Sequence, residues 1–150
     1  MLKRIDHVGM LVENLEDAKD FLSGLGLTLV KESDAPVWNR MFAYFQCGDT
    51  YIELVQDLDD AERATRLQGK TARVEHVAFE VDDIYETIGE LDRKGMKLDE
   101  LPPDHAGASA GAVPGVLTGD FRGRRRSAAW TKPSEISDLT MQLVSYEDTN

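Results

Sequence analysis

The 150-residue sequence holds a single cysteine, Cys47, so no disulfide can form within the chain. It also lacks any apolar run near the ~20 residues that a helix needs to span a bilayer, which argues against a membrane protein. The chain begins Met-Leu-Lys-Arg-Ile-Asp-His and runs straight into a strand-like pattern, so we expect no signal peptide. These absences together favour a reducing compartment, and we expect a cytoplasmic protein.

Basic residues are also scarce, with 17 Lys and Arg against 28 Asp and Glu and a formal net charge of −11. Such a surface repels a phosphate backbone, which argues against nucleic acid as a partner. Hydrophobic residues make up 41% of the chain and charged residues 30%, the balance of a soluble globular protein. The length suits one ordinary domain or two interlocked small modules.

What the sequence does contain is an internal repeat. Residues 4–29 align with residues 73–98 without a gap at an offset of 69, and seven of the 26 pairs are identical, His7 and His76 among them. A match at a fixed period indicates a duplicated module. We therefore predict a single domain over 1–150, made of module one (about 3–57), a linker (58–72) and module two (about 73–146).

Both copies open with an alternating strand. On one face of each strand a histidine, His7 or His76, is followed by a very small residue, Gly9 or Ala78. The small residue leaves room for a group beside the imidazole.

A helix is predicted after each of these strands. Asn14 and Asp83 are the expected N-caps, and Gly26 and Gly95 are the expected left-handed residues past the helix ends. Each module then reads β-α-β-β-β, which predicts an α+β fold. The later strands are expected at 27–32, 41–47 and 51–56 in module one, and at 96–101, 127–131 and 139–144 in module two, where a Gly/Pro-rich loop fills 102–120.

Four polar residues occupy pseudo-equivalent places in the two copies. His7 corresponds to His76, and Glu53 corresponds to Gln142, because Ile-Glu-Leu-Val in one copy matches Met-Gln-Leu-Val in the other. If the modules pack about a pseudo-twofold axis, these side chains converge on one concave face. Two imidazoles, a carboxylate and an amide oxygen suit one divalent ion such as Zn²⁺, Ni²⁺, Co²⁺, Mn²⁺ or Fe²⁺. The competing interpretation is two structural core histidines and a solvated amide.

Taken together, the two copies resemble a known group of proteins. His-Val-Gly-Met-Leu-Val-Glu-Asn-Leu in one copy and Glu-His-Val-Ala-Phe-Glu-Val-Asp-Asp-Ile in the other resemble the vicinal oxygen chelate superfamily. Its members include glyoxalase I, methylmalonyl-CoA epimerase, extradiol dioxygenases, fosfomycin-modifying transferases and bleomycin-binding proteins. Ile52-Glu-Leu-Val-Gln56 and Ala129-Trp-Thr-Lys-Pro133 look most like the epimerase branch. The resemblance implies two βαβββ modules, each a cupped mixed sheet, around a central cavity that encloses the metal.

The resemblance also implies the site residues. The superfamily's metal ligands fall on His7, Glu53, His76 and Gln142, and its catalytic positions fall on Glu53 and Gln142. In the epimerase branch the last position is usually Glu, linked to the metal and to proton transfer, whereas Gln142 cannot act as a base. Epimerases also tend to carry another carboxylate in the preceding strand, and 41–47 holds none. Both departures weigh against two-base racemisation and leave a single-base reaction through Glu53.

Three further side chains are candidates for substrate binding. Glu80 shares a strand face with His76 and can line the cavity, although a rim carboxylate fits the pattern equally well. Arg124 belongs to the Arg-rich run 122–126, which can hold an anionic group such as a carboxylate or a CoA phosphate, or can form a solvated turn. Trp130 can line a pocket or belong to the core.

We therefore expect a metal-dependent isomerase, epimerase or lyase. Its small-molecule substrate would chelate the ion through two oxygens, and the ion would stabilise the enolate formed on loss of a C–H proton. Two rival functions stay open: a metal-free drug-binding protein and an Fe(II)-dependent dioxygenase. Exposed sheet edges and the apolar residues around 27–30 lead us to expect a homodimer.

Overall fold

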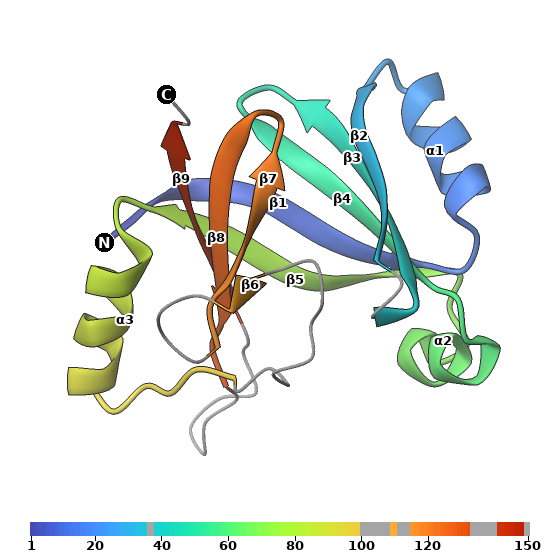
Figure 1. Ribbon diagram of the computed structural model, residues 1–150. Helices are drawn as coiled ribbons and strands as arrows, with labels where there is room; N and C mark the ends of the chain where they lie inside the picture. The colour runs from blue at the N-terminus through green and yellow to red at the C-terminus, as the bar shows by residue number, and fades with distance from the viewer. Residues whose placement is uncertain (36–37, 100–108, 111–114, 133–140, 149–150) are drawn as a thin grey trace. The chain divides into compact units, whose positions relative to one another are not determined.

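A computed structural model describes the chain apart from residues 36–37, 100–108, 111–114, 133–140 and 149–150 (Figure 1). In chain order the elements are β1 (Leu2–Val12), α1 (Leu15–Gly24), β2 (Thr28–Ala35), β3 (Arg40–Cys47), β4 (Thr50–Asp57), α2 (Asp60–Leu67), β5 (Ala72–Val81), α3 (Ile84–Arg93), β6 (Ser109–Ala110), β7 (Leu117–Phe121), β8 (Arg124–Trp130) and β9 (Met141–Asp148). None of the helices in the described ranges is long and apolar enough to cross a membrane.

The chain forms two compact units whose limits differ from those of the repeat. The first unit is Asp6–His76, and the second unit combines Met1–Ile5 with Val77–Asn150. Strands β1 and β5 therefore each contribute residues to both units. Both histidines of the repeat belong to the first unit.

The sheet of the first unit has the strand order β2-β3-β4-β1, with antiparallel hairpins and a parallel β1–β4 pair. One of its faces packs under α1, where Val12, Phe45 and Leu54 meet Leu15 and Leu22 of the helix in a buried cluster. The opposite face carries a second cluster, in which Leu11 and Val55 pack against Leu67 at the end of α2. The alternation read from the sequence thus separates the helix-covered face from the face that bears His7.

Both repeat helices begin and end as predicted. The side chains of Asn14 and Asp83 accept hydrogen bonds from backbone N–H groups of the first turn. Gly26 and Gly95 have φ of 86° and 78°. The backbone N–H of Leu27 donates to the carbonyl oxygen of Leu22, five residues earlier. After Gly95, the N–H of Met96 donates to the carbonyl oxygen of Leu91 in the same way. This is the Schellman ending that favours glycine, so the duplication extends to the helix caps.

The second unit repeats the plan with the strand order β5-β9-β8-β7-β6 and a parallel β5–β9 pair. Helix α3 covers one face, where Val81, Ile84 and Leu143 lie in the buried cluster. The opposite face carries Ala78 and Val144. The predicted α+β fold of two βαβββ modules is confirmed, with β6 as an additional short strand in the second module.

Two predictions about the second module were wrong. Of the strand expected over 96–101, the described part, 96–99, makes a single bridge between Leu98 and Thr131, and residues 100–101 lie outside the described residues. Within the loop expected over 102–120, Ser109–Ala110 and Leu117–Phe121 are strands, and the rest of 100–114 lies outside the described residues. Gly119, exposed in the middle of β7, interrupted the apolar alternation that reveals a strand.

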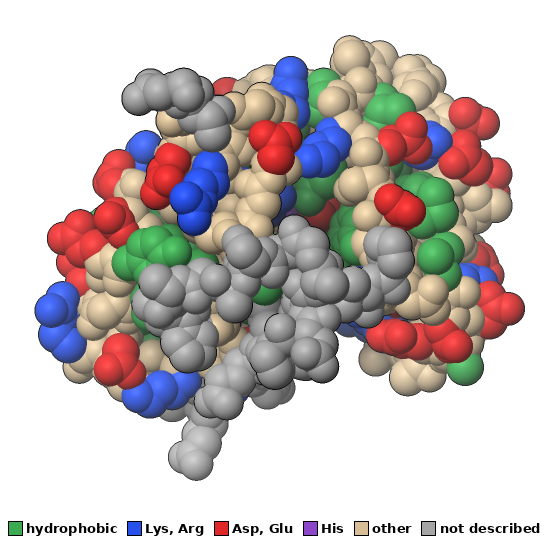
Figure 2. Space-filling view, in the orientation of Figure 1, with side chains coloured by type: hydrophobic (Ala, Val, Ile, Leu, Met, Phe, Trp, Pro, Cys, Tyr) green, Lys and Arg blue, Asp and Glu red, His purple; other side chains and the backbone are tan. Residues whose placement is uncertain are grey.

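The first unit presents acidic side chains over its helices. On the face shown in Figure 2 they gather over α1 and α2, whose first turns carry Glu16, Asp17, Asp60 and Glu62. Carboxylates in a first turn complement the positive end of the helix dipole, which accounts for their placement there.

Candidate metal centre

Strand register places the site. In the first unit Gly9 of β1 pairs with Glu53 of β4, and Tyr44 of β3 pairs with the same Glu53 from the other side. Paired residues share a sheet face, so Gly9, Glu53 and Tyr44 lie in one row across three strands. His7 lies two residues before Gly9 and so on the same face. Of these residues, His7, Glu53 and Tyr44 have polar side chains, and all three are buried.

Three ligand atoms from His7, Glu53 and His76 converge above this row. His7 Nε2 lies 3.1 Å from His76 Nε2, Glu53 Oε2 lies 3.1 Å from His76 Nε2, and His7 Nε2 lies 3.3 Å from Glu53 Oε2. Atoms bound to one ion at about 2.1 Å, with angles between 90° and 109°, are separated by about 3.0–3.4 Å. The triangle therefore has the dimensions of three ligands of a single metal ion.

Gly9 makes this convergence possible. A Cβ atom added to Gly9 would lie 2.1 Å from His76 Cε1, 2.4 Å from Nδ1 and 2.6 Å from Nε2. The His76 ring thus occupies the space that a side chain at position 9 would fill, and it stands at 89° to the His7 ring. The very small residue predicted beside the first histidine does leave room, and the group that takes the room is the second histidine.

A carboxylate on the preceding residue orients each imidazole. Asp6 Oδ2 lies 2.7 Å from His7 Nδ1, and Glu75 Oε2 lies 3.4 Å from His76 Nδ1. Where such a carboxylate accepts the N–H of Nδ1, the ring is left with a lone pair on Nε2; Asp6 is hydrogen-bonded to His7 in this way, and Glu75 lies at ion-pair distance from His76. The repeat has therefore duplicated a carboxylate–histidine pair, with Asp6 and Glu75 in equivalent positions.

These assignments fit a metal. With both Nδ1 atoms protonated, the triangle consists of two imidazole lone pairs and one carboxylate oxygen, which repel one another unless a positive charge lies among them. A divalent cation bound among the three atoms would supply that charge. His, His and carboxylate within 4.8 Å form such a ligand group for Zn²⁺, Ni²⁺, Co²⁺, Mn²⁺ or Fe²⁺.

The second oxygen of Glu53 is also engaged. The Tyr44 hydroxyl donates a short hydrogen bond to Glu53 Oε1, so Oε2 is turned toward the imidazoles. Burial alone raises the pKa of Glu53, but the neighbouring His7 and His76 outweigh it and, with no metal bound, hold that pKa well below its usual range. Glu53 is thus an ionised side chain with a fixed orientation.

The other sequence-predicted residues lie in the second unit. Gln142 pairs with Ala78 and with Trp130, which repeats the arrangement of Glu53 between Gly9 and Tyr44. Its Oε1 is buried with no hydrogen-bond partner among the described residues, as expected of an atom reserved for a ligand. Its role as fourth ligand stays a prediction.

The three substrate-binding candidates have partners of their own. Glu80 is ion-paired with Arg4 at 2.7 Å and with Lys3 at 3.2 Å. Arg124 is 2.9 Å from Asp148 and half exposed at the start of β8. Trp130 packs against the cluster of Ala78 and Val144. These contacts account for all three side chains structurally, and their part in substrate binding stays a prediction.

Sequence reasoning missed Tyr44 and the two orienting carboxylates. The two-residue turn Gly48-Asp49 pairs Cys47 with Thr50, and three steps back along both strands Tyr44 faces Glu53. That hairpin register was a usable signal for Tyr44. For the carboxylates the signal was the match of Asp6 with Glu75 in the repeat.

Residues 4–122 match the Glyoxalase/Bleomycin resistance protein/Dioxygenase superfamily. The chain belongs to this superfamily. The resemblance inferred from the sequence is thereby confirmed. The uncharacterized protein YqjC of Bacillus subtilis is 28% identical over 104 residues, covering 67% of this chain and 74% of YqjC. A lactoylglutathione lyase of Neisseria meningitidis is 32% identical over 97 residues, covering 61% of this chain and 67% of the lyase.

Solved structures show the same fold. Methylmalonyl-CoA epimerase from Mycobacterium tuberculosis superposes with a TM-score of 0.70 at 20% identity, over 99% of this chain and 90% of the epimerase. Its structural likeness supports the superfamily fold. Proteins similar in sequence to this chain thus include a lactoylglutathione lyase, an epimerase shares its fold, and the superfamily's name also covers bleomycin resistance proteins and dioxygenases.

Proposed function

We propose that this chain is a metal-dependent isomerase, epimerase or lyase acting on a small substrate that chelates the metal through two oxygens. The observation that carries the proposal is the triangle of His7, Glu53 and His76, in which three atoms of metal-ligand type lie 3.1–3.3 Å apart. Two imidazoles and a carboxylate with ligand atoms this close form the donor set that divalent transition metals prefer.

A divalent ion bound by these residues would act as a Lewis acid on the substrate oxygens and so acidify the adjacent C–H bond. His7 and His76 bind through Nε2 because Asp6 and Glu75 hold their Nδ1 protons. Glu53 is the proposed base: its carboxylate is ionised, and Tyr44 keeps one oxygen turned away so that the other faces the site.

Gln142 limits the chemistry. An amide oxygen ligates a metal but takes no proton at neutral pH, so Gln142 is proposed as the fourth ligand and not as a second base. A reaction that removes and returns a proton through one carboxylate fits this set. The named relatives, a lactoylglutathione lyase and a methylmalonyl-CoA epimerase, support this class of reaction without specifying the substrate.

The first test measures metal and proton exchange together. Purified protein would be stripped of metal, titrated with each of the five candidate ions, and incubated in D₂O with an α-hydroxycarbonyl, a β-keto acid and a thioester bearing a second carbonyl. We expect about one ion per chain and metal-dependent C–H exchange in at least one compound by NMR. Stoichiometric metal retained by the variant with both His7→Ala and His76→Ala would contradict the proposed site.

A second candidate function is Fe(II)-dependent oxygen chemistry. Two histidines and one carboxylate are the set that non-haem iron oxygenases use, and His7, His76 and Glu53 form that set within the first unit. Oxygen uptake by the Fe²⁺-loaded protein, with a catechol as substrate, would favour this function. Absence of any metal binding would instead favour a metal-free binding protein. A homodimer stays part of the proposal, to be tested by light scattering.

A further inference from the structure

Helix α2, which connects the two repeats, contributes a charged side chain that reaches toward the metal centre. Leu67 is buried against Leu11 and Val55, on the sheet face that carries the triangle of ligand atoms. This packing fixes the last turn of the helix. Arg66, the residue before Leu67, is therefore held beside the strands that carry the ligands.

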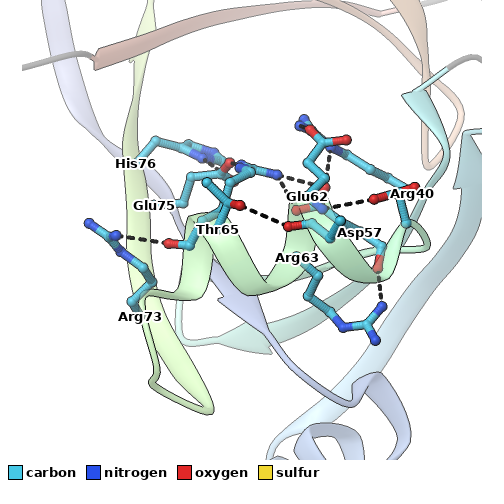
Figure 3. A network of polar contacts seen from close by, with 11 residues as sticks. Arg40, Asp57, Glu62, Arg63, Thr65, Arg73, Glu75 and His76 are labelled. Atoms are coloured by element: carbon cyan, nitrogen blue, oxygen red, sulfur yellow. Dashed lines mark hydrogen bonds and ion pairs between the residues drawn. The ribbon is translucent and has the colours of Figure 1, made fainter.

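The guanidinium of Arg66 bridges two carboxylates from different strands. One of its nitrogens, Nη1, donates to both oxygens of Asp57 at 2.6 and 2.5 Å, and the other, Nη2, forms a short ion pair with Glu75 Oε1. Asp57 is almost fully buried and also accepts from Arg40 at 2.7 Å, so it is a fixed anchor. In Figure 3, Glu75 and His76 lie at one end of this network and Arg40 at the other.

Glu75 is the less firmly placed of the two orienting carboxylates. Asp6 is 1% exposed and 2.7 Å from its imidazole, whereas the Glu75 side chain is 24% exposed and 3.4 Å from His76 Nδ1. A free glutamate loses up to about 2 kcal/mol of rotamer entropy when it is ordered, so without a second contact Glu75 would leave His76 for solvent part of the time. The contact with Arg66 supplies that restraint.

We propose that Arg66 is a positioning residue of the metal centre: it holds Glu75 against His76 Nδ1 and so keeps Nε2 as the metal-binding atom. The inference rests on the proposed metal site, and it assigns the connecting helix a part in the site. Arg66 binds neither metal nor substrate. Its effect passes through Glu75 to the tautomer and orientation of His76.

The direction in which metal affinity changes when the Arg66 charge is removed distinguishes a positioning role from a purely electrostatic one. Arg66 is a cation near a site for a cation, so Coulomb repulsion alone predicts that removing its charge strengthens metal binding. Positioning predicts the opposite: loss of an orienting partner costs about 10–100-fold in metal affinity. Because the Glu75–His76 contact is long, we expect the lower end, about tenfold.

The experiment compares Arg66→Gln with Arg63→Gln, a matched control. Arg63 lies on the same helix and its removal changes the net charge equally, but its contacts go to Asp60 and to the backbone oxygen of Asp57. Zn²⁺ affinity would be measured by competition with a chelator, and the His76 tautomer by long-range ¹H–¹⁵N NMR of the metal-free protein. We expect about tenfold weaker binding and a mixed tautomer in Arg66→Gln, with wild-type values in Arg63→Gln.

Unchanged or stronger Zn²⁺ binding by Arg66→Gln, with an unchanged His76 tautomer, would overturn the inference while leaving the proposed function intact. If the wild type bound no metal, the proposed function would fail, and the tautomer comparison would still decide the role of Arg66. Should Arg66→Gln not fold, Glu75→Ala tests the same link, because it leaves the Asp57–Arg66 pair in place. Glu75→Ala with wild-type affinity and a single His76 tautomer would also overturn the inference.

Discussion

Replacing Gly9 by alanine would put one methyl group into the space that the His76 ring fills. The new Cβ would lie 2.1 Å from His76 Cε1, whereas carbon atoms in contact are about 3.5–4.0 Å apart. The ring, or the strand that carries it, would have to move by about 1.4 Å or more. Metal–ligand distances tolerate about 0.2 Å, so His76 would be lost as a ligand. We expect divalent-metal affinity to fall by at least about 100-fold, beyond the usual cost of losing an orienting partner.

The strand itself should tolerate the substitution. Gly9 does not have a left-handed φ, so alanine fits its backbone, and alanine in a strand is favoured over glycine by about 0.5–1 kcal/mol. Overpacking against the ring costs about 1–3 kcal/mol, so we expect a folded, moderately destabilised protein by urea denaturation.

Gly119→Ala in β7 is the matched control for Gly9→Ala, because a Cβ there meets nothing within 4 Å. Metal affinity would be measured for both variants by chelator competition. Wild-type affinity in Gly9→Ala would refute the reasoning, since it would mean that His76 does not need this space in order to bind.

Four further predictions concern Glu53, Gln142 and Tyr44. Glu53→Gln should reduce substrate proton exchange far more than metal binding, and Gln142→Glu should fold and add a second base; NMR in D₂O and metal titration check both. Tyr44→Phe removes the donor to Glu53 Oε1, so metal affinity should fall about 10-fold, measured by chelator competition. Because the folded pKa of Glu53 is depressed, its stabilisation is present above the ordinary value of 4.5 and lost as pH falls toward the folded value. Urea denaturation of metal-free protein should show this loss in wild type and not in Glu53→Gln.

The ligand triangle was predictable because duplication marks it. His7 and His76 coincide in the repeat, and Glu53 was singled out by its match with Gln142; the pairing of Gly9 with Glu53 then puts it on the face of His7. The orienting carboxylates were hidden by the same alternation. Successive strand residues point to opposite faces, so Asp6 and Glu75 are expected to point away from the imidazoles that follow them, yet both side chains reach Nδ1.

The tertiary contacts of charged side chains could not be predicted from the sequence pattern. Arg66 looks like one of several solvated charges on a polar helix, since helical periodicity shows that Leu67 is buried but not which carboxylates its neighbour meets. The segment expected as a strand over 96–101 failed for a similar reason. Its apolar character predicts extended backbone, but among the described residues 96–99 a bridge forms only between Leu98 and Thr131, just past the end of β8, and local pattern does not fix that tertiary contact.

The boundary between the two compact units has an evolutionary consequence. The first unit ends at His76, so it takes its second histidine from the beginning of the second repeat. A half-length ancestor carrying one repeat would have held one such histidine per chain and needed two chains to assemble the ligand triangle. Gene fusion then turned a contact between subunits into one within a single polypeptide. A present-day chain cut at 69–70, after α2, should accordingly bind metal only when its two fragments are mixed.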